Sequence, residues 1–215
     1  MEELRQYTPM DHLICQFDQA LRTLFGRPKG TGRPNPAEGV LDEPLTEAER
    51  QESIRLVRVD HTGEVCAQAL YQGQALTARL DQVRERMEQS AHEENDHLLW
   101  CEERLRELGG RTSLLNPFFY LGSLSIGALA GAIGDRWSLG FVAETERQVI
   151  RHLDDHLARL PQGDRRSRAI LEQMKEDEAK HGNMALAAGG AELPVPVRRL
   201  MQAMSKVMTG TTYWI

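Results

Sequence analysis

Two copies of the pattern Glu-x-x-His put ionisable side chains on faces that the chain has to bury, and this feature most constrains the fold. One copy is Glu94 to His97 and the other is Glu178 to His181. Around both copies, apolar residues recur at alternating steps of three and four, which is the spacing of a helix face packed in a bundle. Buried ionisable groups are costly unless they are paired or bind a metal. The fold must therefore bring partners to these side chains.

Four long segments have helical periodicity and contain no proline: residues 46–80, 81–108, 135–160 and 164–188. Thr46 and Glu49 have the spacing of a capping box at the start of the first segment. Glycine pairs at 109–110 and 189–190 end the second and fourth segments, and Pro161 ends the third. No segment shows convincing strand alternation. We therefore predict an all-α fold built on a four-helix bundle.

The first and third helices each carry one glutamate on their apolar stripe. Glu64 precedes Glu94 by 30 residues, and Glu146 precedes Glu178 by 32. Each half of the bundle thus supplies a lone glutamate and then a Glu-x-x-His, which is the ligand set of a dinuclear carboxylate site. Four carboxylates balance the charge of two divalent cations, and mixed carboxylate and imidazole ligands favour iron or manganese. The predicted ligands are Glu64, Glu94, His97, Glu146, Glu178 and His181.

Other polar residues lie close to these ligands in the sequence. Three of them could hydrogen-bond to the ligands or could simply pack in the core: His61, Tyr71 and His152. Three more fall off the stripes and are expected to be solvated: His92, Glu93 and Glu144. Asp177 could orient a neighbouring group, but the sequence alone gives it no firm role.

Residues 114–134 form an uncharged stretch of 21 residues between the second and third helices. Its length would suit a membrane span, but an early proline and several glycines argue against one. It could be a buried helical connection, and Gly127 and Gly131 would then allow close helix packing. It could instead be an interfacial element that meets a bilayer or an apolar substrate. For that role the candidate contact residues are Phe118, Phe119, Leu121 and Ile126.

The remaining regions flank this bundle. Residues 1–45 read as an arm and linker with a short helix, 46–190 as the bundle, and 191–215 as a helical tail. The net charge of −6 argues against nucleic-acid binding. The three cysteines are scattered, which excludes a disulfide framework. Because no basic stretch precedes an apolar run near residue 1, no secretory signal is expected.

Four stretches resemble the demethoxyubiquinone hydroxylase family of ubiquinone biosynthesis, in its bacterial form: LVRVDHTGEVCAQALYQGQA (56–75), EENDHLLWCEERL (93–105), FVAETERQVIRHLDDHL (141–157) and EDEAKHG (176–182). The resemblance implies a ferritin-like fold with two iron ions held by the six residues named above. It also implies O₂-dependent hydroxylation of a polyprenylated methoxy-benzoquinol. We expect a peripheral protein on the cytoplasmic face of the bacterial cell membrane, with a homo-oligomer or an accessory lipid-binding protein as further partners.

Other functions on the same scaffold stay open from the sequence. A peroxidase or a manganese catalase could use the same ligands, and an iron-storage or iron-handling protein could share the bundle. A helical adaptor would have no use for buried carboxylates on all four stripes. Metal stoichiometry would separate these classes, because an enzyme binds a pair of ions, a storage assembly binds many and an adaptor binds none.

Overall fold

The computed structural model of the protein describes residues 9–27 and 29–215. Seven helices account for most of this part of the chain, and it contains no strand. In chain order they are α1 (Pro9–Phe25), α2 (Glu47–Thr77), α3 (Asp81–Glu107), α4 (Asn116–Ile133), α5 (Asp135–Arg159), α6 (Arg165–Ala187) and α7 (Val195–Thr212). The all-α prediction is confirmed.

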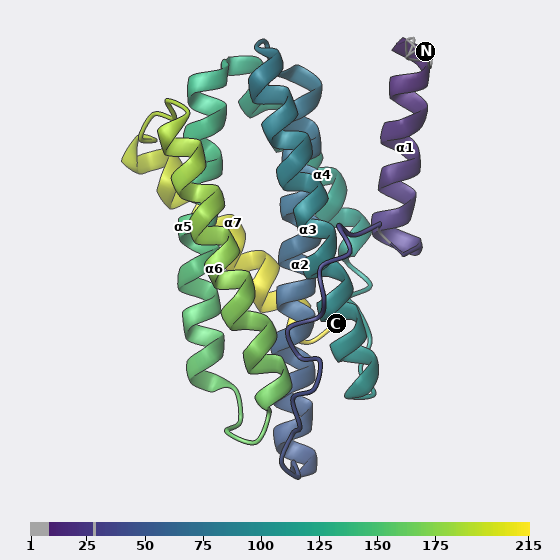
Figure 1. Ribbon diagram of the computed structural model, residues 1–215. Helices are drawn as coiled ribbons and strands as arrows, with labels where there is room; N and C mark the ends of the chain where they lie inside the picture. The colour runs from purple at the N-terminus through teal and green to yellow at the C-terminus, as the bar shows by residue number, and fades with distance from the viewer. Residues whose placement is uncertain (1–8, 28) are drawn as a thin grey trace.

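Helices α2, α3, α5 and α6 form the bundle (Figure 1). Figure 1 shows α5 and α6 side by side on one side of the molecule, and α2, α3 and α4 on the other. The predicted helix ends follow from local chemistry. Thr46 and Glu49 form the capping box, with the Glu49 amide 3.3 Å from the Thr46 hydroxyl and the Thr46 amide 2.8 Å from the Glu49 carboxylate. Gly109 and Gly189 take the left-handed conformation after α3 and α6, at φ of 73° and 97°.

Two apolar clusters fill the bundle, one toward each end. The first contains Ile54, Val57, Trp100, Cys101, Leu105, Leu153, Ile170, Leu171 and Met174 among others. The second contains Ala67, Tyr71, Ala75, Val83, Met87, Leu139, Val142 and Ala185 among others. On all four helices the predicted ligands lie in the sequence between members of the two clusters. A buried polar layer therefore crosses the bundle between two apolar layers.

Helix α4 is the structure of the uncharged segment, and it packs lengthwise on the outside of α2 (Figure 1). The close approach depends on glycine. A Cβ atom at Gly127 would collide with the Leu70 carbonyl group, and one at Gly131 would lie 2.9 Å from the Gln74 carbonyl oxygen. The helix is apolar and long enough to cross a membrane, but only 28% of its span is buried in the protein. Of the two alternatives, the buried connection is therefore wrong, because one face of α4 has no described part of the chain against it.

The segment between α1 and α2 lies along the bundle rather than away from it (Figure 1). Thr31 and Arg33 contact the Asp96 carboxylate of α3, with 2.8 Å from the Thr31 amide and 3.0 Å from the Arg33 Nε. Further along, Asp42 accepts a 2.7 Å bond from the buried Arg104 guanidinium. At the other end of the chain, the Tyr213 hydroxyl donates to the Glu52 carboxylate of α2. Both flanking regions thus contribute to the bundle surface.

Candidate metal centre

The bundle brings all six predicted ligands together. Their ligand atoms form two overlapping groups, and within each group the atoms lie within 4.8 Å of one another. One group contains Glu64, Glu94, His97 and Glu178, and the other contains Glu94, Glu146, Glu178 and His181. Glu94 and Glu178 belong to both groups, so these two carboxylates are placed to bridge a pair of ions. Each ion would then have one further glutamate and one histidine of its own.

Hydrogen bonding inside the protein leaves the cluster unsatisfied. Each of the four carboxylates has one buried oxygen that makes no hydrogen bond of regular geometry among the described residues: Glu64 Oε2, Glu94 Oε1, Glu146 Oε2 and Glu178 Oε1. Histidine nitrogens approach three of these oxygens, those of Glu64, Glu94 and Glu178, at 3.2–3.5 Å. Each of these residues is no more than 2% exposed. Buried oxygens without partners are costly, and buried carboxylates in native proteins are paired or coordinate metals. The donor set therefore fits a pair of divalent cations.

The two histidines turn the same ring nitrogen toward the carboxylates. His97 Nδ1 lies 3.0 Å from Glu94 Oε2 and 3.2 Å from Glu178 Oε1. His181 Nδ1 lies 3.2 Å from Glu94 Oε1 and 3.3 Å from Glu178 Oε2. The Nδ1 atoms are therefore the metal-facing atoms, and the Nε2 atoms are free to donate to other groups.

The acceptors for those Nε2 atoms are acidic residues that precede the opposite Glu-x-x-His. His97 Nε2 lies 3.2 Å from Asp177 Oδ2, and His181 Nε2 lies 2.8 Å from Glu93 Oε2. A carboxylate behind a ligating imidazole fixes its tautomer and its orientation. The expectation that Glu93 is solvated is therefore wrong: its side chain is 29% exposed and contacts a predicted ligand. The sequence contains a clue to these contacts, because an acidic residue directly precedes each Glu-x-x-His motif.

Asp177 is also held from outside the bundle. The Arg33 guanidinium reaches Asp177 Oδ2 at 2.9 Å and Asp96 Oδ2 at 3.0 Å, and it lies 5.0 Å above the Trp100 ring. Burial favours the neutral form of Asp177, but His97, Arg33 and Lys180 hold its pKa well below the ordinary value. The segment before α2 thus supports a metal-facing histidine through one carboxylate.

The four carboxyl groups of the cluster divide into two kinds. Burial and the neighbouring Glu94 raise the pKa of Glu64 well above its usual value, and burial and Glu178 do the same to Glu146. Burial also opposes ionisation of Glu94 and Glu178, but the adjacent histidines lower the pKa of both groups. In the metal-free protein, Glu64 and Glu146 therefore bind protons more readily than Glu94 and Glu178 do.

The histidines complete this balance. Burial opposes their charged forms, but the carboxylates around them raise the pKa of His97 well above 6.5 and that of His181 to about 12. Two imidazolium groups then neutralise Glu94 and Glu178 when no metal is bound. Two divalent ions would replace all of these protons and leave the same net charge of zero. Metal binding is therefore coupled to proton release.

The three residues predicted as hydrogen-bond partners or packing residues have different surroundings. Tyr71 donates its hydroxyl to Glu146 Oε1, beside the cluster. His61 is 5% exposed, and its Nδ1 lies 3.4 Å from the Asn116 amide nitrogen of α4. His152 is found with Asp60 and His156 instead of a predicted ligand. Its interpretation as a partner of the ligands is wrong.

Glu144 also departs from the expectation that it is solvated. It is 3% exposed, and its carboxylate accepts a 2.8 Å bond from Arg147 of α5. Gln148 reaches both Glu144, at 2.8 Å, and the Arg198 carbonyl oxygen of α7, at 3.4 Å. The C-terminal helix therefore covers a face of α5 that would be exposed in an isolated bundle. His92, by contrast, is exposed as expected.

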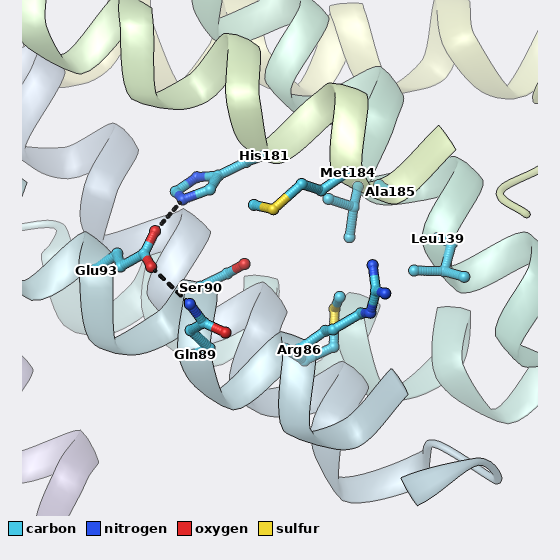
Figure 2. A pocket seen from close by; sticks show the side chains of 10 residues that line it. Arg86, Gln89, Ser90, Glu93, Leu139, His181, Met184 and Ala185 are labelled. Carbon is cyan, nitrogen blue, oxygen red and sulfur yellow. Dashed lines mark hydrogen bonds and ion pairs between the residues drawn. The ribbon is translucent and has the colours of Figure 1, made fainter. Parts of the chain in front are cut away.

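A pocket opens from the surface to the His181 side of the cluster (Figure 2). Figure 2 shows Glu93 between the His181 ring and the Gln89 amide, with Met184, Ala185 and Leu139 farther along the pocket. Its lining is largely apolar, and it includes residues of α3, α5 and α6. The pocket therefore reaches from the surface to the outer side of the His181 ring, where Glu93 contacts Nε2.

Comparisons with known proteins identify the family and the fold of the chain. The curated relatives include 3-demethoxyubiquinol 3-hydroxylases of Nitrosococcus oceani, 59% identical over 99% of this chain and 100% of that relative, and of Stutzerimonas stutzeri, 59% identical over the full length of both. Among solved structures, the bacterioferritin-related protein of Bacteroides fragilis, a dodecameric thioferritin, matches with a TM-score of 0.56. It is 18% identical, and the match covers 78% of this chain and 94% of that one. This likeness confirms the ferritin-like fold. Residues 51–212 match the family described as ubiquinone biosynthesis protein COQ7, and the chain belongs to that family.

Proposed function

We propose that the protein binds two iron ions and uses O₂ to hydroxylate the ring of a demethoxyubiquinol during ubiquinone biosynthesis. The observation that carries the proposal is the convergence of four buried glutamates and two buried histidines in two ligand groups that share Glu94 and Glu178. The hydroxylase names of the relatives supply the reaction class and the substrate.

The bound iron pair would supply the electron transfer that activates O₂. One oxygen atom enters the ring C–H bond as a hydroxyl group, and the other leaves as water with two electrons and two protons from a reductant or from the quinol. The protein's part is to hold the ions and to keep water away. Asp177 and Glu93 orient the two imidazoles, and the apolar clusters close the site at both ends. The pocket in Figure 2 marks the side of the bundle, next to His181, from which the ring would approach once side chains there move apart.

The direct test is a single-turnover reaction with the full-length protein. The metal-free protein is loaded with Fe²⁺ without oxygen, then mixed with ¹⁸O₂, a reductant and a demethoxyubiquinol. We expect a product with one added ¹⁸O atom. Glu146→Ala and Glu178→Ala should each abolish it, whereas Glu144→Gln, a buried carboxylate of α5 outside the cluster, should form it normally. Iron taken up in large excess without product would favour storage, and a manganese-dependent turnover of peroxide would favour a catalase.

We also propose that the exposed face of α4 docks on a membrane that carries the quinol. Phe118 and Leu121 are 72% and 62% exposed, whereas Phe119 and Ile126 are half-buried. Helix α1 contacts α4 and adds exposed Phe17 to the apolar surface. An apolar surface of this kind suits a prenyl tail that stays in the bilayer while the ring enters the protein.

Vesicle flotation tests the docking surface. Phe118→Asp with Leu121→Asp should release the protein from vesicles of phosphatidylethanolamine and phosphatidylglycerol. Leu41→Asp is the matched control, because Leu41 is 80% exposed but lies in the segment before α2. Equal flotation of both variants with the unchanged protein would contradict docking through α4.

A further inference from the structure

A second cluster of metal-type ligands lies on α2 and α5, apart from the six residues above. It consists of Asp60, His152 and His156, which offer ligand atoms within 4.8 Å of one another. Asp60 Oδ1 is 2.8 Å from His156 Nδ1 and 3.6 Å from His152 Nε2. The two histidines stand one turn apart on α5, with ring centroids separated by 3.9 Å. Asp60 faces them from α2.

Hydrogen bonding does not account for this convergence. Both Asp60 oxygens, His152 Nε2 and His156 Nδ1 are buried, and none has a hydrogen-bond partner among the described residues. The Asp60 side chain has no exposed surface, and that of His156 is 3% exposed. At 2.8 Å, Asp60 and His156 form an ion pair when the imidazole is protonated, and a divalent cation can take the place of that proton. A cation among them would satisfy all four atoms.

The separations match a coordination shell. With bonds of about 2.0–2.1 Å, neighbouring ligand atoms around a tetrahedral ion lie about 3.3 Å apart. The two measured separations, 2.8 Å and 3.6 Å, fall on either side of that value. Burial and the adjacent His156 lower the pKa of His152 to about 4, so its imidazole is in the neutral form that binds metals. Its side chain is 24% exposed, which leaves a route for an ion from solvent.

From this geometry we propose that Asp60, His152 and His156 bind a third divalent transition-metal ion, Zn²⁺ or Fe²⁺, through two imidazoles and one carboxylate. Asp60 precedes Glu64 by one helical turn, and His152 follows Glu146 by six residues on the antiparallel α5. The ion would therefore lie about 6–9 Å along the bundle from the pair. The site goes beyond the proposed hydroxylase reaction and does not depend on it.

Zinc counting on the full-length protein tests the site. The metal-free protein is equilibrated with Zn²⁺, separated from unbound metal and analysed for bound zinc by mass spectrometry of the elements. We expect three ions per chain in the unchanged protein and two in His156→Ala. His92→Ala, which removes an exposed histidine of α3, is the matched control and should keep three. An equal count in His156→Ala and the unchanged protein would overturn the proposal.

A variant without the dinuclear cluster allows zinc binding at Asp60, His152 and His156 to be measured alone. Glu94→Ala with Glu178→Ala removes both bridging carboxylates, and circular dichroism verifies that its helices persist. This variant should keep one zinc ion, and X-ray absorption at the zinc edge should show two imidazoles in its coordination shell. Adding His156→Ala should remove that ion. Zinc retained after His156→Ala would again overturn the proposal, while the ¹⁸O product test of the hydroxylase would be unaffected.

Discussion

Removal of Asp177 tests whether the carboxylates behind the histidines support metal binding. Asp177→Ala deletes the acceptor of His97 Nε2, 3.2 Å away, and leaves that buried nitrogen without its charged partner. Loss of such a partner typically weakens metal binding 10–100-fold, or about 1.4–2.7 kcal/mol. Because His97 belongs to only one of the two ligand groups, the loss should fall mainly on one of the two ions. Asp177→Asn keeps a hydrogen-bond acceptor but not the charge, so its iron affinity should lie between those of Asp177→Ala and the unchanged protein.

The assay is an anaerobic Fe²⁺ titration against a competing chelator. Asp96→Ala is the matched control, since Asp96 shares Arg33 with Asp177 at 3.0 Å and 2.9 Å but makes no contact with His97 among the described residues. It should loosen the segment before α2 and leave the iron affinity within about twofold of the unchanged protein. Equal losses in both variants would mean that Arg33 and the docked segment matter, not the carboxylate behind His97, and would refute the reasoning.

Three more outcomes follow from the same structure. Metal-free protein should lose stability as pH rises above about 4.5, because the folded chain keeps protons on Glu64 and Glu146 that the unfolded chain releases. Above about pH 6.5, His97 and His181 add a loss of about 1.4 kcal/mol per pH unit each for the same reason. Urea midpoints at about pH 6 and about pH 8 measure the loss, and a higher midpoint at the higher pH would be inconsistent with it. Gly127→Ala should destabilise the fold by about 1–3 kcal/mol, because the added methyl group clashes with α2. Gly122→Ala adds a methyl group in open space and should stabilise the helix by up to about 1 kcal/mol. Thermal unfolding compares the two variants, and similar shifts of their melting temperatures would argue against close α2–α4 packing. Leu105 is 1% exposed in the first apolar cluster, so Leu105→Ala should lower the free energy of unfolding by about 2–5 kcal/mol in chemical denaturation. The number of bound metal ions should stay the same. A loss of metal would show that the ligands depend on the packing of this apolar cluster.

The helices and the six clustered residues could be predicted because they depend on local rules. Steps of three and four put Glu94 and His97 on the same face as Met87 and Leu105, and that face had to be buried whatever lay opposite. Proline and glycine positions then fixed the helix ends. Two such motifs with two lone glutamates left few alternatives to a shared cluster.

The residues around the cluster depend on tertiary packing and could not be placed in this way. Glu144 is buried beside Arg147 and Gln148, on a face of α5 where Gln148 also contacts α7, and no periodicity within α5 reports such a neighbour. Glu93 and Asp177 stand one position off the stripe, yet each reaches across to the histidine of the facing helix. His152 lies six residues from Glu146, a rotation of about 240°, so it faces another direction and meets Asp60 instead.

The most direct test of the central claim is anomalous X-ray diffraction at the iron edge from crystals loaded with Fe²⁺. The account predicts two peaks within bonding distance of Glu94 and Glu178, separate from any iron bound at Asp60, His152 and His156. One peak should also contact His97 and the other His181. A single peak near Glu94 and Glu178, or iron bound only elsewhere on the protein, would contradict it.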